Sequence, residues 1–202
     1  MPGPDQALYQ LFHPQGRLGR RLPGDSAALF DWIERMAGGD HWVAHSLREH
    51  LPLWGWRLLF HMSNSGLLFR RYPAEEFDRR HGTWNSRSRN TNKAGLYDGQ
   101  RHEIVVNARH WSGRILHHEL GHVLDRMVSS LNTSFSTGLW HGFAPTRNGF
   151  LTDYAASHPQ EYLAVCLERF LCDDSDALWL ERNDPGMHAF LNALFELSSA
   201  SY

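Results

Sequence analysis

The segment "GRILHHELGHVLDRMV", from Gly113 to Val128, constrains this chain most, because two histidines four residues apart flank a glutamate. At about 100° per residue, His122 falls about 40° from His118 on a helical projection, and Glu119 about 100° from it. The apolar residues of the segment gather on the opposite side, at Leu116, Leu120, Val123, Leu124 and Met127. We therefore predict a helix that buries one side and presents two imidazoles and a carboxylate to a cleft.

This H-E-x-x-H motif is by itself only a hypothesis, since a chain with 14 histidines contains such a string by chance in roughly one case in twenty. A catalytic zinc ion takes three protein ligands and keeps a further position for water, so a third ligand must lie elsewhere. A metzincin has a histidine six residues after the second motif histidine, but Val128 occupies that position. The first glutamate after Glu119 is Glu161, which makes it the leading candidate; Glu168 and His141 rank behind it.

Glu161 lies in "TDYAASHPQEYLAVCLERFL", which has the features of a second helix. Ser157 can cap this helix, and Pro159 is tolerated in its first turn. We therefore expect Glu161 near the start of a helix that continues to about Leu171.

The N-terminal half has mostly helical signals. "DSAALFDWIERMAG", from Asp25 to Gly38, begins with capping residues and has apolar residues at helical spacing, and Asp40 can cap a helix through His50. "WGWRLLFHM", from Trp54 to Met62, favours a strand. The polar stretch from Arg70 to Lys93 favours a long exposed connection.

Two β-rich runs meet at Asp98-Gly99, a dipeptide that favours a hairpin turn. The second run ends in Ile104 to Asn107 and leads directly into the motif helix. A chain of 202 residues suits one domain. We expect a helical N-terminal subdomain with a strand over residues 1–94 and a zinc-binding catalytic subdomain over residues 95–202.

The combination of "HHELGHVLD" with "YAASHPQEYLAVCLERFL" resembles the catalytic domain of the anthrax lethal factor-like metallopeptidases. This gluzincin group includes the bacterial Pro-Pro endopeptidases, and the resemblance covers roughly residues 95–197. It implies an α+β, mostly helical zincin-like domain with a small antiparallel sheet beside the active-site helix. It also implies one zinc ion per chain and six matching positions: the ligands His118, His122 and Glu161, the base Glu119, and the partners Asp125 and Tyr154.

The implied activity is zinc-dependent hydrolysis of peptide bonds. Zinc acidifies its water and polarises the scissile carbonyl, while Glu119 accepts the proton of the water and passes it to the leaving amine. Tyr154 would donate a hydrogen bond to the oxyanion. Asp125 either orients a ligand imidazole or is an ordinary aspartate on the helix surface.

The chain departs from the family pattern at one position of the second helix. Many members carry a second glutamate four residues after the glutamate ligand, where this chain has Val165. Glu168 is the available substitute, although a carboxylate on a helix face is more commonly solvated.

Two regions are candidates for substrate contacts. The strand from Ile104 to Asn107 can pair with an extended peptide, which makes Val105 and Asn107 candidates. The segment between the two motif helices is a loop of about 25 residues, and such loops are uncommon unless functional or mobile. It carries Trp140, His141 and Phe143 as candidate cleft residues, although aromatic residues packed under a long loop are the commoner arrangement.

Three other patterns suggest alternatives. His41, His45 and Glu49 recur every four residues, but no remote ligand accompanies them, and a solvated helix face explains them. The stretch from Arg70 to Lys93, with interleaved aromatic residues, is typical of single-stranded nucleic-acid binding, although its acidic residues weaken this interpretation. The chain could also be a catalytically inactive, zinc-stabilised protein-binding module, in which Glu119 would be dispensable.

The composition narrows the range of partners and of cellular locations that we expect. A formal net charge of −2 predicts no general attraction to nucleic acid or membranes, and no apolar run is long enough to span a bilayer. Cys166 and Cys172 lie six residues apart in one predicted helix, a poor geometry for a disulfide, so we expect core residues in a reducing compartment. We expect a soluble monomer without a signal peptide that acts on a protein or peptide, either in the cytoplasm or as an exported toxin or effector.

Overall fold

A computed structural model describes residues 34–35, 37–50, 68–81, 94–129, 135–144, 147–172 and 174–199. The described part is mostly helical with one small sheet, so the expected α+β class is confirmed. The helices and strands follow one another as α3 (His41–His50), β1 (Leu68–Tyr72), α5 (Ala74–His81), β2 (Gly95–Asp98), β3 (Glu103–Asn107), α6 (Gly113–Ser129), α7 (Phe135–Phe143), α8 (Pro159–Cys172), α9 (Asp174–Asn183) and α10 (Pro185–Ser199). None of the described helices combines the length and apolar character needed to cross a membrane.

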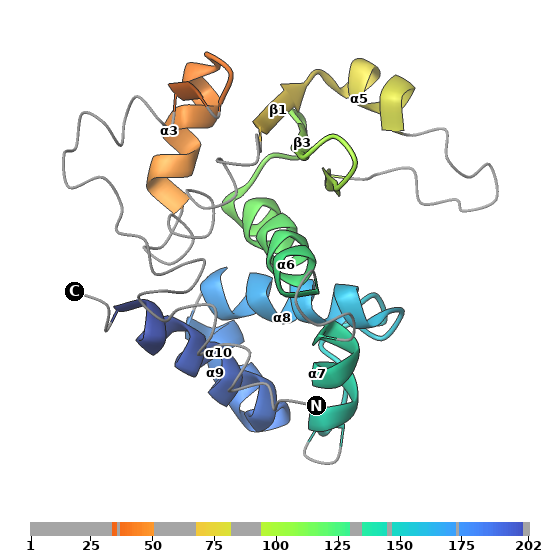
Figure 1. The fold of residues 1–202 in the computed structure, drawn as a ribbon, viewed down its shortest axis with the longest axis vertical. Helices are drawn as coiled ribbons and strands as arrows, with labels where there is room; N and C mark the ends of the chain where they lie inside the picture. The colour runs from red at the N-terminus through yellow and green to blue at the C-terminus, as the bar shows by residue number, and fades with distance from the viewer. Residues whose placement is uncertain are drawn as a thin grey trace.

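Helix α6 connects two parts of the fold (Figure 1). The sheet lies at one end of α6 together with α3 and α5, and α8 crosses α6 beside a helical body formed by α7, α9 and α10. Buried residues from Ala37 to Leu194 form one core cluster. Described residues of both segments, 1–94 and 95–202, contribute to this cluster.

The sheet is mixed, so the expected antiparallel sheet is wrong. Its strand order is β1-β3-β2, with β1 parallel to β3 and β2 antiparallel to β3. A parallel pair needs a crossover connection, and the segment between β1 and β3 is long enough to provide one. It contains α5 and the β2 strand of the hairpin. The hairpin is confirmed, and Asp98 Oδ1 closes its turn by accepting the amides of Gln100 and Arg101 at 2.9 and 3.1 Å.

Strand β3 lies in the centre of this sheet, which overturns the expectation that a substrate pairs with it. Both of its edges already pair with neighbouring strands, so no backbone groups remain for an added peptide. Val105 is fully buried and Asn107 is 3% exposed. These two residues are therefore structural.

Two segments that were predicted to be irregular connections contain helices. Helix α5 occupies part of the stretch from Arg70 to Lys93, and its Phe77 is 1% exposed. Glutamates in its first turn and arginines in its last turn complement the helix dipole, a signal that the polar composition concealed. Helix α7 likewise occupies part of the predicted loop between the motif helices.

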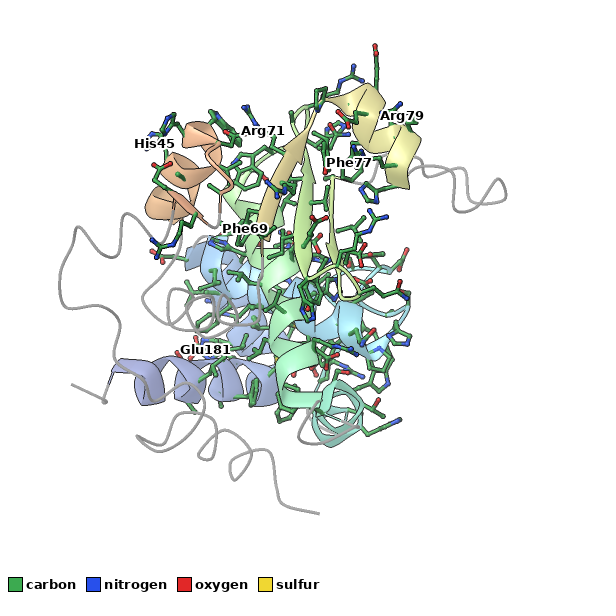
Figure 2. All side chains as sticks on the ribbon, turned by 45° about the horizontal axis from the view of Figure 1, so that its top comes forward. His45, Phe69, Arg71, Phe77, Arg79 and Glu181 are labelled. Atoms are coloured by element: carbon green, nitrogen blue, oxygen red, sulfur yellow. The ribbon has the colours of Figure 1, made fainter. Side chains whose placement is uncertain are left out.

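Helix α3 begins as predicted. Asp40 Oδ1 accepts hydrogen bonds from the amides of Trp42 and Val43 at 3.0 and 3.2 Å, so Asp40 is its cap. Arg71 of β1 donates from Nε to Asp40 Oδ2 at 3.1 Å and lies over the Trp42 ring, which links α3 to the sheet (Figure 2). Most of the predicted Asp25–Gly38 helix, and all of the predicted Trp54–Met62 strand, lie outside the described residues.

Candidate metal centre

Helices α6 and α8 approach each other at the level of the backbone. A Cβ atom added to Gly121 would lie 2.6 Å from Ala164 Cα, closer than real Cβ atoms come to other atoms. Glycine at position 121 therefore permits this crossing. The predicted apolar side of α6 is buried at Leu116, Leu120, Val123 and Leu124. The other side of α6 faces α8, which places the motif histidines opposite Glu161.

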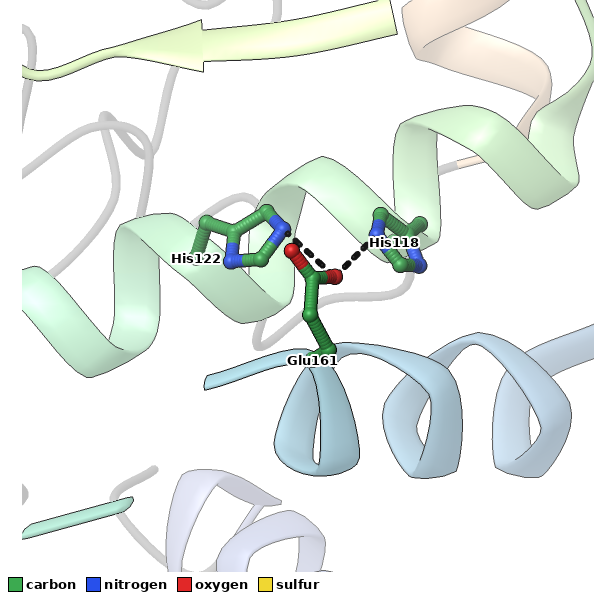
Figure 3. Close-up of side chains that lie close together, drawn as sticks. All are labelled: His118, His122 and Glu161. Atoms are coloured by element: carbon green, nitrogen blue, oxygen red, sulfur yellow. Dashed lines mark ion pairs between the residues drawn. The ribbon is translucent and has the colours of Figure 1, made fainter. Parts of the chain in front are cut away.

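The structure brings the three predicted ligands together (Figure 3). Glu161 Oε2 lies 3.3 Å from His118 Nε2 and 3.4 Å from His122 Nε2. One donor atom of each residue lies within 4.8 Å of the other two. Of the residues that the structure describes, no other histidines, cysteines or acids form such a group. The cluster is a candidate site for a metal ion.

The donor atoms of this cluster fit a cation. Glu161 Oε2 is buried and makes no hydrogen bond of ordinary geometry, although two imidazole nitrogens face it. A cation between these three atoms would accept one lone pair from each of them. Burial alone would lower the pKa of His118, but the neighbouring carboxylates of Glu161 and Glu168 raise it to about 10. The same electrostatic field that favours a proton on this imidazole favours a metal cation.

Glu119 lies between the two histidines on α6 and is 4% exposed. Burial raises the pKa of its carboxyl group, against the opposing effect of His122 and His118. The backbone amide of Tyr97 on β2 hydrogen-bonds to this carboxylate, while its Oε2 atom is buried without a hydrogen bond. A buried carboxylate with a raised pKa, next to a candidate metal site, is suited to accept a proton from a nearby water.

Tyr154 lies beside the ligands, in the turn that precedes α8. Its ring stacks on the His118 ring with centroids 5.9 Å apart and planes inclined by 27°, and it is 55% exposed. Partial burial raises the pKa of its hydroxyl, and the negative charge and hydrogen bonding of Glu161 raise it further. The hydroxyl therefore stays protonated, and remains a donor, at neutral pH.

The start of α8 differs slightly from the prediction. Pro159 is the first residue of the helix as expected, but the Gln160 amide donates to His158 Nδ1 at 3.3 Å. Ser157 instead donates its hydroxyl proton to the Tyr154 carbonyl at 2.6 Å and so stabilises the preceding turn. His158 rather than Ser157 thus occupies the capping position.

Asp125 is 2% exposed, so its interpretation as an ordinary surface aspartate is wrong. Its Oδ2 atom accepts a hydrogen bond from Gln160 Nε2 at 2.8 Å. This bond joins α6 to the residue immediately before Glu161 and helps to hold that candidate ligand in place. A role of Asp125 in orienting an imidazole stays a prediction.

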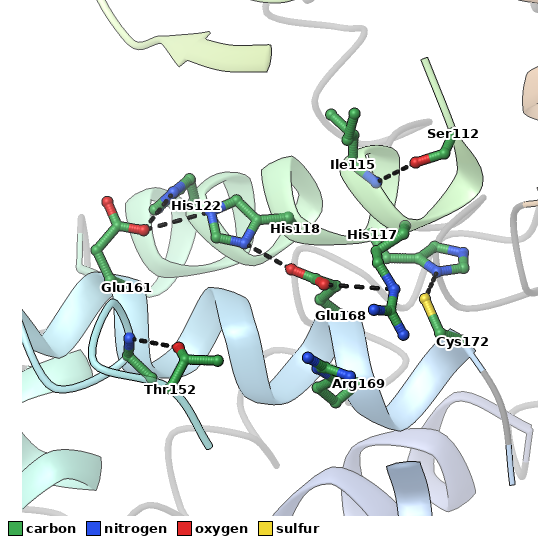
Figure 4. Close-up of polar contacts among 12 residues, drawn as sticks. Ser112, Ile115, His117, His118, His122, Thr152, Glu161, Glu168, Arg169 and Cys172 are labelled. Atoms are coloured by element: carbon green, nitrogen blue, oxygen red, sulfur yellow. Dashed lines mark hydrogen bonds and ion pairs between the residues drawn. The ribbon is translucent and has the colours of Figure 1, made fainter. Parts of the chain in front are cut away.

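Glu168 is not solvated, contrary to the commoner behaviour of a carboxylate on a helix face. Its Oε2 atom lies 3.1 Å from His118 Nδ1, and its Oε1 atom lies 3.5 Å from Arg114 Nε (Figure 4). Glu161 and Glu168 are seven residues apart, which is two helical turns. That spacing is the signal in the sequence that could have identified the contact.

Other candidate residues lie away from the ligand cluster. Trp140 packs against the rings of Phe150 and Tyr162 at 4.6 and 5.6 Å, so it is one of the aromatic residues that support the core. His141 is exposed on α7, and it is not part of the ligand group. Cys166 and Cys172 are both free thiols; Cys166 is buried in the core, whereas Cys172 Sγ lies 3.7 Å from His117 Nδ1.

No model of a known protein family matches the chain, and no curated protein matches it either. The case for a function therefore depends on the geometry of this site. Three features carry it: the group of His118, His122 and Glu161, the buried Glu119, and the neighbouring Tyr154.

Proposed function

We propose that the protein is a zinc-dependent metalloendopeptidase of the zincin type. The observation that carries the proposal is the convergence of His118, His122 and Glu161 from two helices, with the buried Glu119 beside them. Two imidazoles and one carboxylate form a common ligand set of catalytic zinc. A bound zinc ion supplies Lewis acidity, which acidifies water and polarises the scissile carbonyl.

Glu119 is the proposed general base. Its carboxylate takes a proton from the attacking water, and burial, which raises its pKa, helps it to hold that proton. The same carboxyl group then donates the proton to the leaving amine. The Tyr97 amide and the close approach of Gly95, whose added Cβ would lie 3.2 Å from Glu119 Oε1, restrict the position of this carboxylate.

Tyr154 is the proposed donor to the oxyanion. Its hydroxyl keeps its proton at neutral pH, since the ordinary pKa of tyrosine lies well above 7 and burial and the charge of Glu161 raise it further. Such a donor is most effective when it is aimed at the charge that develops in the transition state. Stacking on His118 holds the ring on the ligand side of the site.

We propose that an extended peptide substrate pairs with β2 rather than with β3. The Asn107 amide donates to the Ala94 carbonyl at 2.9 Å. In an antiparallel ladder this bond directs the backbone groups of Gly95 and Tyr97 away from β3. Among the described residues no strand pairs with that edge. A peptide bound there lies next to Glu119, because the Tyr97 amide donates to its carboxylate. The backbone groups of Gly95 and the Tyr97 carbonyl are the ones left for the peptide.

The proposal is tested with the Glu119→Gln variant. Zinc content is measured by mass spectrometry, and hydrolysis is followed with a library of quenched fluorescent peptides. The variant should keep its zinc, whereas turnover should fall on the order of a hundredfold or more, because the amide cannot accept the proton. The control is Glu181→Gln, which removes an exposed carboxylate on α9 and should behave as wild type.

Two outcomes would contradict the proposed mechanism. Unchanged turnover in Glu119→Gln would exclude Glu119 as the base. A wild-type protein that holds zinc but cleaves no peptide of the library would favour the alternative of a zinc-stabilised binding module.

A further inference from the structure

The polar contacts between α6 and α8 extend beyond the ligand cluster. On α6, Arg114, His118 and His122 recur every four residues and therefore share one helix face. On α8, Glu161 and Glu168 lie within about 20° of each other and about 10.5 Å apart along the axis. The contact of Gly121 with Ala164 lies between them, so both carboxylates reach across to α6.

The two nitrogens of His118 face different carboxylates. Its Nε2 atom faces Glu161 at 3.3 Å, and its Nδ1 atom lies 3.1 Å from Glu168 Oε2. A neutral imidazole carries its proton on one nitrogen only, and a carboxylate acceptor at Nδ1 holds the proton there. The lone pair of Nε2 is then directed at the candidate metal site.

Other charged side chains hold Glu168 in turn. Arg114 Nε lies 3.5 Å from Glu168 Oε1, and Arg114 Nη2 lies 2.6 Å from Asp176 Oδ2. Arg169 Nη1 donates to the same Asp176 carboxylate at 2.8 and 2.9 Å. The side chain of Glu168 is only 16% exposed, so these partners reduce its freedom to turn towards water. The charges alternate in sign along this chain of contacts.

We infer that Glu168 is a positioning residue for His118, and that Arg114 holds Glu168 in the required orientation. The contact fixes the ring orientation of His118 and keeps its proton on Nδ1 when Nε2 binds a metal ion. The inference rests on the proposed function, because it takes His118 as a zinc ligand. Val165, four residues after Glu161, is buried and apolar and cannot accept a hydrogen bond. The carboxylate that contacts His118 Nδ1 therefore belongs to Glu168, seven residues after Glu161.

Zinc affinity tests this inference without any measurement of catalysis. The dissociation constant is obtained by competition with a chromogenic chelator at fixed pH. Glu168→Met removes the acceptor and keeps most of the side-chain volume, and it should weaken zinc binding by about 10- to 100-fold. Glu168→Gln keeps an oxygen that accepts from Nδ1–H, so it should recover part of this loss. Glu181→Met, an exposed control, should bind zinc as tightly as wild type.

A second measurement separates positioning from general support of the fold. In nitrogen-15 spectra of the zinc-loaded protein, the Nδ1 proton of His118 should be visible and protected from exchange in wild type, and lost in Glu168→Met. Equal zinc affinities of wild type and Glu168→Met would overturn the inference. The inference would also be overturned if Glu168→Met lowered only the thermal stability of the metal-free protein and left the Nδ1 proton signal of His118 unchanged. A wild-type protein that binds no zinc would instead contradict the proposed function.

Discussion

Helices α3 and α6 each carry two histidines four residues apart, but their surroundings differ. His41 of α3 has a 90% exposed side chain and pairs with the nearby Glu34 at 3.2 Å. His118 and His122 of α6 are 13% and 19% exposed and share Glu161, a residue about forty positions along the chain. The same local spacing therefore gives a solvated face in one helix and a candidate metal centre in the other.

The difference between the two histidine pairs comes from α8, the helix that packs against α6. Polar groups removed from water need partners, and on α6 the partners come from α8. His118 and His122 each face a carboxylate of α8 that could not reach them without the close contact at Gly121. Within the described side chains, α3 contributes nothing to a comparable group.

The largest effect should come from removing a ligand. Wild type should hold one zinc ion per chain, and His118→Ala, His122→Ala and Glu161→Ala should each lose it, because three protein ligands are needed. His41→Ala and His45→Ala should keep full occupancy. Metal content of dialysed protein, measured by mass spectrometry, checks this. Full occupancy in Glu161→Ala would mean that the third ligand lies elsewhere.

Tyr154→Phe should have the next largest effect. The ring and its stacking on His118 are retained, so folding and zinc content should not change. Loss of the hydroxyl should lower kcat by about ten- to a thousandfold with little change in KM. Steady-state kinetics on a peptide identified from the library provide the test. A large rise in KM with kcat intact would make Tyr154 a substrate-binding residue instead.

Gly121→Ala should reduce stability and zinc affinity together. The new methyl group would collide with Ala164, and overpacking of this kind costs about 1–3 kcal/mol. Gly142→Ala on α7 is the matched control, because no atom lies within 4 Å of an added Cβ there. That variant should match wild type or exceed it by up to about 1 kcal/mol, since alanine favours helices. Urea unfolding and chelator competition measure both quantities. A harmless Gly121→Ala would contradict the importance of the close crossing.

Asp40→Ala should give the smallest effect and should be confined to α3 and its contact with β1. Loss of the capping bonds to Trp42 and Val43, together with the ion pair to Arg71, should cost about 1–2 kcal/mol of unfolding free energy. Hydrogen exchange should become faster in α3 but not in α6, and zinc affinity should stay at the wild-type value. A loss of zinc from this variant would show that the two helices are coupled.

Local features were predictable from the sequence because their causes lie within a few residues. The two faces of α6 follow from helical periodicity, the cap at Asp40 from a side-chain oxygen near free amides, and the hairpin from Asp98-Gly99. Glu161 was predictable as a candidate ligand because few glutamates follow the motif.

Contacts between segments that are distant in the sequence became visible only in the tertiary structure. The position of β3 between β1 and β2 removed the expected substrate edge, and helix α5 was hidden by its polar composition. The partnership of Glu168 with His118 depends on the crossing of α6 and α8, which Gly121 and Ala164 permit. Periodicity and capping act within one segment, whereas the pairing of distant segments depends on which surfaces are buried together, and no local pattern encodes that choice.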